Sequence, residues 1–264
     1  MHDAGQLIAS AAEVYEEFFV PALFGPWAPR LVARAGLHPG EKVIDVACGT
    51  GVLAVEAERA VSPNGSVVAV DLNPGMLAVA RRKASDVDWQ QAPAEDLPFE
   101  DASFDATLSQ FGLMFFADQQ AALREMWRIL RPGGGFVVAV WDALENAPGY
   151  AAVTALLSRL FGNHIADLLK SPYSLGDPAA LLSLLTSAQI PDPKIDRVPG
   201  EARFPSIRSW MHTDVRGWTL AEKLDDTQFE RLAAEAETAL QPFVTAQGDV
   251  RFPHPALVVT ATKA

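Results

Sequence analysis

The stretch from Val43 to Ala54, VIDVACGTGVLA, constrains the fold of this chain more than any other. It combines a β-branched run that ends near an acid, a Gly-Thr-Gly turn and the start of a helical pattern. Gly49 and Gly51 allow a sharp turn and a close approach of the backbone to a ligand, because glycine has no side chain in the way. The unpaired N–H groups of the following helix would face that turn. The stretch therefore predicts a nucleotide-type binding turn after the first strand of an α/β sheet.

Strand-like and helix-like segments alternate around this turn, which is typical of a parallel, doubly wound sheet. The apolar patterns predict strands at 42–46, 66–70, 87–91, 104–110 and 136–140, and helices at 51–60, 75–84 and 117–130. The run 131–135, Arg-Pro-Gly-Gly-Gly, is expected to stop the last of these helices. Upstream, residues 6–35 predict an aromatic-rich helical segment that Pro21, Pro26 and Pro29 break into pieces.

The pattern changes after Trp141. Residues 149–187 predict two or three helices, 194–199 a strand, 203–240 further helices, and 250–262 a return to strand character. We expect an α/β fold with a Rossmann-like, doubly wound, mostly parallel seven-stranded sheet, helices on both faces and an added helical cap. Residues 1–145 would form the ligand-binding core with an N-terminal helical lid. Residues 146–264 would add the sheet-edge strands and a helical substrate cap to the same globular unit.

Charge and cysteine content narrow the possible partners. A formal net charge of −12 opposes binding to a nucleic-acid backbone, which requires clustered Lys and Arg. The single cysteine, Cys48, excludes a disulfide framework and indicates a reducing compartment. The five histidines lack metal-ligand spacing, so no metal site is expected. With no secretory leader pattern and no apolar run long enough for a membrane span, we expect a cytoplasmic protein, monomeric or homodimeric.

The identity of the nucleotide is not settled by the turn alone. Residues 49–54 fit the form G-x-G-x-x-[GA], which several cofactor classes share. Asp71, 20 residues after Gly51 at the end of the second strand, suits a carboxylate that bonds a ribose diol. NAD(P) would satisfy both features, so a second observation is needed.

Five ordered motifs supply that observation. They are 45–51 (DVACGTG), 71–76 (DLNPGM), 94–99 (AEDLPF), 104–105 (FD) and 130–134 (LRPGG). In this order they resemble the motifs of class I S-adenosylmethionine-dependent methyltransferases. The similarity is closest to the small-molecule branch that includes the ubiquinone/menaquinone C-methyltransferases. It covers the core of the chain and does not extend to the segment after residue 145.

The resemblance implies that the chain binds S-adenosyl-L-methionine and releases S-adenosyl-L-homocysteine. The implied cofactor residues are the lid side chains Tyr15 and Trp27, the methionine-end group Asp45, Ala47, Gly49, Thr50, Gly51, Gln110 and Phe111, the ribose-binding Asp71, and the adenine neighbours Leu72, Met76, Ala94, Glu95 and Leu97. Within this set, Asp45 would lie near the cofactor's ammonium group. An acidic, aromatic-rich pocket suits a sulfonium cation, since aromatic faces attract such cations by about 0.5–2 kcal/mol.

The adenine edge departs from the family pattern. Relatives usually carry Asp immediately before the residue equivalent to Ala94, where it accepts from the adenine amino group. This chain has Pro93 there, and proline offers no such acceptor. Glu95, Asp96, Gln91 or a water molecule would have to replace it.

The cap is expected to determine which acceptor the protein binds. Its Leu- and Phe-rich composition, with Phe204, Trp210 and Trp218, favours an apolar small molecule that is methylated on oxygen or carbon. Residues 209–218 mix aromatic, basic and acidic groups, so they could line the acceptor pocket or form an amphipathic helix with solvated charges. His212 in this stretch is the candidate general base, because an unperturbed histidine titrates near neutral pH.

Two other functions stay open at this point. An NAD(P)-dependent oxidoreductase would fit the turn, although the chain lacks the Tyr-x-x-x-Lys pair of the commonest single-domain form. A non-catalytic scaffold would bind S-adenosylmethionine but lack an acceptor-sized pocket beside the sulfonium.

Overall fold

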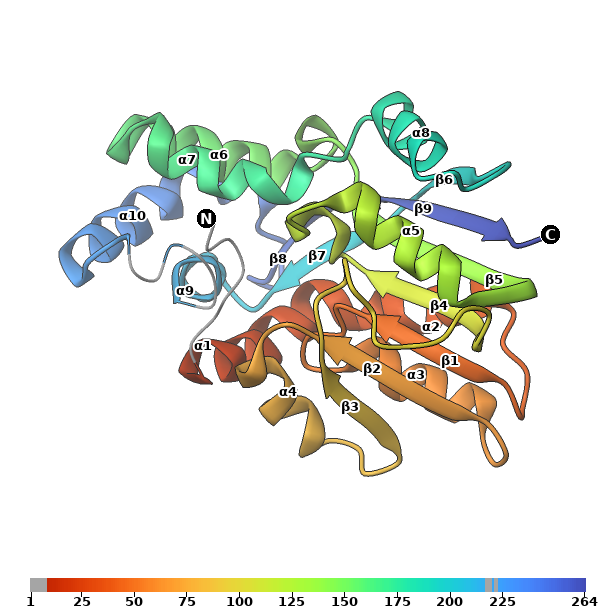
Figure 1. Ribbon diagram of the computed structural model, residues 1–264. Coiled ribbons are helices and arrows are strands. Elements are labelled where there is room, and N and C mark those ends of the chain that lie inside the picture. The colour runs from red at the N-terminus through yellow and green to blue at the C-terminus, as the bar shows by residue number, and fades with distance from the viewer. Residues whose placement is uncertain (1–8, 217–219, 221–222) are drawn as a thin grey trace.

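The central element of the fold is a seven-stranded sheet in the order β3-β2-β1-β4-β5-β9-β6. The structure, a computed structural model, describes residues 9–216, 220 and 223–264 (Figure 1). The strands are β1 Lys42–Val46, β2 Ser66–Asp71, β3 Val87–Gln91, β4 Phe104–Gln110, β5 Leu130–Trp141, β6 Lys194–Val198 and β9 Ala256–Thr262. The pairs among β1 to β5 are parallel, whereas β9 runs antiparallel to both β5 and β6. The predicted mostly parallel, seven-stranded sheet is confirmed.

The helices of the core lie on both faces because the strand order reverses between β1 and β4. Right-handed crossovers that step outward in opposite directions place their helices on opposite faces. Thus α3 (Val52–Val61) and α4 (Pro74–Arg81) follow β1 and β2, while α5 (Gln119–Ile129) joins β4 to β5. Figure 1 shows α5 in front of the sheet and α2 (Ala28–Ala35) and α3 behind it.

The N-terminal segment is less interrupted than expected. It runs through α1 (Ala9–Val14), a π-helical segment (Tyr15–Phe24), a 3₁₀ turn (Gly25–Trp27) and α2. Pro21 lies inside the π-helical segment, where the regular i→i−4 bonds that a proline would break are already replaced. The other two prolines lie at the first positions of their helical turns, where no N–H donor is required.

Two further strand boundaries differ from the prediction. The Arg-Pro-Gly-Gly-Gly run follows the end of α5 at Ile129, as predicted, but it belongs to β5, which was expected to begin at residue 136. A register shift between Phe104 and Ala106 accommodates it. Gly133 there has a φ of +81°, and its N–H donates to the carbonyl of Lys263 across 2.7 Å. Residues 203–204, expected to be helical, end strand β7 (Glu201–Phe204).

The last strand region is divided in two. β8 (Val250–Pro253) pairs with β7 in a separate two-stranded sheet, and β9 then enters the main sheet. The cap helices are α6 (Pro148–Phe161), α7 (Asn163–Lys170), α8 (Pro178–Ser187), α9 (Ile207–Arg216) and α10 (Asp226–Ala239). Among them α8 packs on α5 rather than on the other cap helices, and one cluster of buried apolar side chains runs through core and cap. No helix in the described parts of the chain is long and apolar enough to cross a membrane.

Candidate cofactor and acceptor sites

The loop after β1 is a tight turn at the carboxyl edge of the sheet. Ala47 (φ +59°), Gly49 (φ +55°) and Gly51 (φ +85°) all have left-handed backbone conformations. The N–H of Cys48 donates to the carbonyl of Val70 at 3.0 Å, which fixes the loop to β2. A left-handed alanine is uncommon, and such strain gathers at ligand-binding sites. The predicted binding turn is present.

Close packing around the turn requires two of the glycines. A Cβ on Gly51 would overlap the Trp89 ring, with Cζ3 2.7 Å away, and one on Gly112 would lie 2.6 Å from the Cβ of Ala47. The turn after β1 and the loop after β4 therefore meet closely. This is the switch point of the sheet, where ligands bind in open α/β folds.

Two carboxyl groups flank the turn, the buried one of Asp45 and the half-buried one of Asp71. Asp45 is 0% exposed, and neither of its oxygens makes a hydrogen bond of normal geometry, although the Ala54 N–H points toward it. Burial, and secondarily the charge of Asp71, raise the pKa of Asp45 well above its ordinary value. Asp71 accepts from the N–H groups of Gly49 and Asn73, both at 2.8 Å. Burial also raises the pKa of Asp71, and these two bonds oppose the rise.

Tyr15 of the N-terminal lid lies against this acid pair. Burial, and then the negative charges of Asp71, Glu16 and Asp45, raise the pKa of its phenol. The ring stacks on Phe24, with the ring centroids 5.0 Å apart. The structure thus brings one of the two predicted lid residues to the site.

Trp27, the other predicted lid residue, lies deeper in the core. It is 2% exposed and meets Phe111 and Trp141 edge-on, with centroid separations of 5.6 and 6.1 Å. The guanidinium of Arg30 covers its ring at 4.4 Å. Trp27 therefore supports the aromatic wall behind the site, and direct contact with a cofactor stays a prediction.

Several buried oxygen atoms at the site have no hydrogen-bonding partner among the described residues. They include both carboxyl oxygens of Asp45, the hydroxyl of Thr50 and Oε1 of Gln110. Gln110 uses its amide N–H to donate to the carbonyl of Phe24 at 3.2 Å, which ties β4 to the lid. Buried polar groups are normally hydrogen-bonded, so this cluster indicates a polar ligand site.

The adenine neighbours are arranged at the outer end of β2 and β3. Leu72 is 51% exposed, whereas Met76 packs with Ala12, Val79 and Tyr15 below the lid. An exposed leucine beside a buried methionine is consistent with a flat ring resting there. Contact of Leu72 and Met76 with the adenine stays a prediction.

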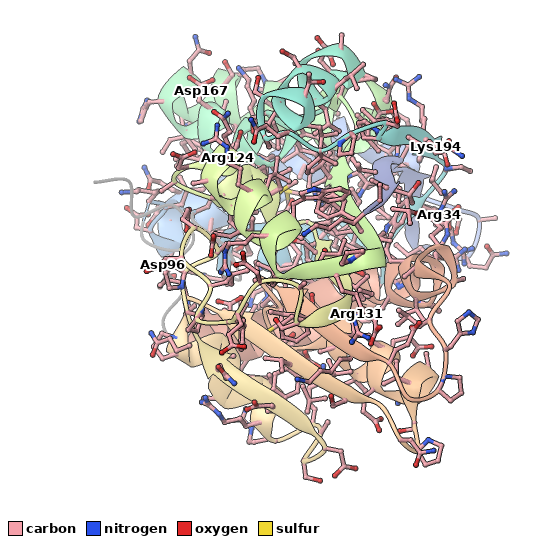
Figure 2. The ribbon with its side chains drawn as sticks, turned by 45° about the vertical axis from the view of Figure 1, so that its right-hand side comes forward. Arg34, Asp96, Arg124, Arg131, Asp167 and Lys194 are labelled. Atoms are coloured by element: carbon pink, nitrogen blue, oxygen red, sulfur yellow. The ribbon has the colours of Figure 1, made fainter. Side chains whose placement is uncertain are left out.

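Two of the side chains that could replace the missing acceptor for the adenine amino group already make hydrogen bonds within the protein. Oε1 of Glu95 accepts from the N–H of Ala117 at 2.8 Å and holds the chain before α5. Gln91 donates its amide to the carbonyl of Leu72 at 2.9 Å, which leaves its own oxygen free. Asp96 is exposed at the surface (Figure 2). The neighbouring Ala94 and Leu97 are buried.

His212, the candidate base, packs between the lid and α10. Its ring lies edge-on to Phe18 at 5.6 Å and to Phe229 at 6.3 Å. Residues two apart on a helix point to nearly opposite sides, so Trp210 and Asp214 of α9 face elsewhere. The catalytic assignment of His212 stays a prediction. Trp218, expected in the same stretch, lies outside the described residues.

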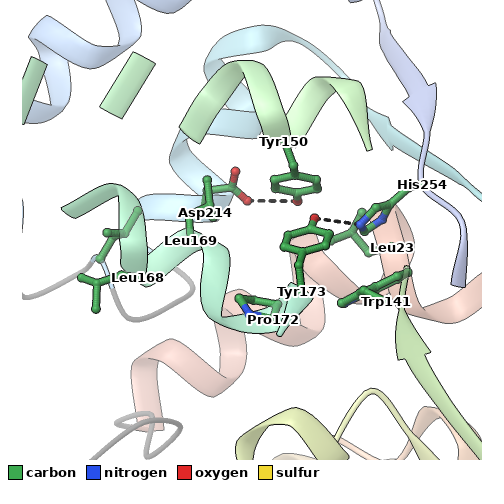
Figure 3. Close-up of a pocket in the computed structure, with 10 residues that line it drawn as sticks. Leu23, Trp141, Tyr150, Leu168, Leu169, Pro172, Tyr173, Asp214 and His254 are labelled. Atoms are coloured by element: carbon green, nitrogen blue, oxygen red, sulfur yellow. Dashed lines mark hydrogen bonds between the residues drawn. The ribbon is translucent and has the colours of Figure 1, made fainter. Parts of the chain in front are cut away.

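The other face of α9 borders a small buried cavity (Figure 3). The cavity is lined by apolar side chains and by four polar ones. The lining residues are Leu23, Trp141, Tyr150, Leu168, Leu169, Pro172, Tyr173, Asp214, Leu220 and His254. Its internal space is enough for about one ordered water molecule.

Sequence reasoning missed most of the polar groups of this cavity. Asp214 belongs to the mixed stretch 209–218, but Tyr150, Tyr173 and His254 are far apart in the chain and carry no motif. Only the packing of α6, the turn after α7, α9 and the segment after β8 brings them together. Within the described parts of the chain no group of three or more His, Cys, Asp or Glu could hold a metal ion.

A doubly wound sheet with its binding turn at the switch point defines a nucleotide-cofactor-binding protein of the Rossmann-like class. The family model described as the ubiE/COQ5 methyltransferase family matches residues 21–171, and the chain belongs to this family. The family assignment therefore agrees with the predicted resemblance.

Similar proteins agree with that membership. A ubiquinone/menaquinone biosynthesis C-methyltransferase UbiE of Hahella chejuensis is 37% identical over 145 residues, which are 53% of this chain and 58% of that protein. One from Xanthomonas campestris is 39% identical over 139 residues, covering 49% and 55%. The matched region thus spans little more than half the length of these relatives.

A solved structure shows the same fold. Phosphoethanolamine N-methyltransferase 2 of Haemonchus contortus, in complex with S-adenosyl-L-methionine, has a TM-score of 0.64 at 18% identity. The match covers 99% of this chain and 58% of that one.

Proposed function

We propose that this chain is an S-adenosyl-L-methionine-dependent methyltransferase (EC 2.1.1.-). It transfers the methyl group to an oxygen or carbon atom of an apolar small-molecule acceptor by in-line displacement and releases S-adenosyl-L-homocysteine. The observation that carries this proposal is the acid pair at the glycine turn, formed by the buried Asp45 and the half-buried Asp71. Neither acid has a Lys or Arg partner among the contacts of the described residues.

The acid pair fits this cofactor better than a dinucleotide. Asp45 offers two unpartnered oxygens to an ammonium group, and Asp71 keeps spare lone pairs for ribose hydroxyls while its backbone bonds hold it in place. A pyrophosphate near two carboxylates would be repelled. When bound, S-adenosyl-L-methionine supplies an activated methyl group on a sulfonium cation, which adjacent negative charge and the Tyr15 ring would stabilise.

The role of the protein is then mainly alignment. Because the leaving group is already activated, holding the acceptor in line with the methyl group can supply about 7–11 kcal/mol of the barrier reduction. Gln110 and Phe111, at the end of β4, would contact the methionine end of the cofactor, where it would meet the acceptor. Residues 1–145 would hold the cofactor and 146–264 the acceptor.

Calorimetry tests cofactor choice. The wild-type chain should bind S-adenosylmethionine and S-adenosylhomocysteine, and it should bind NADH far more weakly. Asp71→Asn should weaken cofactor binding about 10-fold or more, because a charge-assisted hydrogen bond contributes about 1.5–3 kcal/mol. Asp88→Asn is the matched control, since Asp88 is an exposed carboxylate on the neighbouring strand β3. Tighter binding of NADH, or equal effects of the two variants, would contradict the proposal.

Labelling identifies the acceptor. Incubation of cell extract with methyl-labelled S-adenosylmethionine, followed by mass spectrometry, should give one labelled apolar product. Cofactor binding with no labelled product would favour a non-catalytic scaffold.

Cys48 is free and buried in the structure, which supports a reducing compartment, and we propose the cytoplasm. A monomer or homodimer would suffice for this activity.

A further inference from the structure

The cavity beneath the helical cap contains a buried carboxyl group with unused hydrogen-bonding capacity. Asp214 is 3% exposed, and the Tyr150 hydroxyl donates to its Oδ1 at 3.3 Å. Its Oδ2 has no hydrogen-bonding partner among the described residues. The Trp210 indole N–H lies close to the carboxyl but does not complete a hydrogen bond of normal geometry. Figure 3 shows the Asp214 carboxyl and the Tyr150 hydroxyl facing each other at one side of the cavity.

No positive charge among the lining residues balances this carboxyl. His254 pairs with the Tyr173 hydroxyl at 2.9 Å, and burial lowers the pKa of His254 to about 3, so the ring is neutral near pH 7. Burial raises the pKa of Asp214 to about 8, while the nearby Tyr150 hydroxyl and Trp210 indole oppose that rise. The carboxyl therefore exists in both protonation states near neutral pH.

The unpartnered Oδ2 belongs to a carboxyl that lines a space for about one water molecule, and a hydroxyl group is a polar group of that size. A protonated Asp214 would donate a hydrogen bond, and an ionised one would accept it. A hydroxyl group can serve both states, since it accepts as well as donates. An ammonium group would fit only the ionised state, and an ether could not donate to the ionised carboxylate.

The cavity also adjoins the cofactor site. Trp141, at the end of β5, stacks on Phe111 with centroids 3.6 Å apart and on His254 with centroids 3.9 Å apart. Phe111 directly follows Gln110, and Leu23 of the cavity wall directly precedes Phe24, which stacks on Tyr15. The stacked rings of Trp141 and Phe111 therefore connect His254 of the cavity to the end of β4 at the cofactor site.

We propose that this cavity is the acceptor subsite and that Asp214 binds a hydroxyl group of the acceptor through Oδ2. The apolar body of the acceptor would lie against Leu168, Leu169 and Leu220. Since the space now accommodates about one water molecule, a larger acceptor must displace the α7 side chains. The assignment rests on the proposed methyltransferase function and adds the substrate group that the cap recognises.

The test uses a matched pair of probes on the full chain saturated with S-adenosylhomocysteine. ¹⁹F NMR titration would measure Kd for 4-fluorophenol and for its methyl ether, 4-fluoroanisole. At about pH 9, where Asp214 is mostly ionised, the wild type should prefer the phenol by about 10-fold or more, because the ether cannot donate a hydrogen bond to the carboxylate. Asp214→Leu should reduce that preference to about 2-fold or less. Asp167→Asn, an exposed carboxylate on α7 that pairs with Lys170, should leave it unchanged (Figure 2).

A second measurement does not depend on any variant folding. A crystal structure of the wild type soaked with 4-bromophenol should show the phenol oxygen within hydrogen-bonding distance of Asp214. Equal affinity for the two fluorinated probes, no binding of the phenol, or bromine density elsewhere would overturn the inference. Calorimetry with S-adenosylmethionine on the same protein, before S-adenosylhomocysteine is added, separates this outcome from failure of the proposed function, which would show as absent cofactor binding.

Discussion

Replacing Gly51 by alanine should destabilise the protein for two separable reasons. The first is conformational, because Gly51 has φ +85° and a Cβ in the left-handed region costs about 1–2 kcal/mol. The second is steric, because the new Cβ would overlap the Trp89 ring, and overpacking costs about 1–3 kcal/mol. Together they predict a loss of about 2–5 kcal/mol in the free energy of unfolding.

Gly133→Ala provides the matched control. Gly133 has a similar φ of +81°, but a Cβ added there would meet no described atom within 4 Å, so only the conformational loss of about 1–2 kcal/mol should appear. Urea-induced unfolding of both variants would measure the difference.

A double-mutant cycle with Trp89→Leu isolates the steric part. In that background Gly51→Ala should cost only about 1–2 kcal/mol, because the shorter leucine leaves room for the methyl group. Equal losses for Gly51→Ala and Gly133→Ala would refute the reasoning. The same loss from Gly51→Ala with and without Trp89 would also refute it.

The other predictions concern three carboxyl groups. Burial raises the pKa of Asp214 from 3.8 to about 8. The protonated carboxyl therefore stabilises the folded state most below pH 4, and this stabilisation is lost as pH rises to about 8. Asp214→Asn should remove this part of the pH dependence from the urea midpoints measured across this range. Glu95→Ala should speed hydrogen exchange at the Ala117 amide, whose 2.8 Å bond it removes, and unchanged exchange would contradict this. Arg197→Met should lower the free energy of unfolding, measured with urea, by about 1–3 kcal/mol, because the buried Asp142 carboxylate loses the Arg197 Nε that lies 2.5 Å from its Oδ2. An unchanged free energy would show that this ion pair contributes nothing to stability.

Local sequence patterns were sufficient for most of the parallel core. Strand bounds at 42–46 and 104–110 match the structure, because buried strands of a parallel sheet are rich in apolar and β-branched residues. The bounds at 87–91 also match, although this edge strand is mostly polar and only partly buried. The run 131–135 follows the end of α5 at Ile129, as predicted, but the predicted start of the fifth strand at residue 136 was wrong, since the glycines enter the sheet through a register shift. Pairing with a neighbouring strand decided that case, and no local pattern encodes it.

The residues of the candidate site also differ in whether the sequence could predict their positions. Asp45 and Asp71 could be found from sequence, because each ends a strand and parallel strands bring their carboxyl ends to one edge. Tyr15 could be proposed only through the resemblance, and its place against both acids depends on how the π-helical segment packs. Trp27 has similar aromatic character, yet its orientation places it in the core wall.

By itself, the sequence determined the glycine turn, the acids beside it and the family to which the chain belongs. These features are local, since a few adjacent residues set backbone conformation and strand ends. The tertiary structure alone decided that β9 lies between β5 and β6, and that Tyr150, Asp214 and His254 share one cavity. Such contacts join segments that are far apart in the chain. They form when the cap packs against the sheet, and no short stretch of sequence predicts this packing.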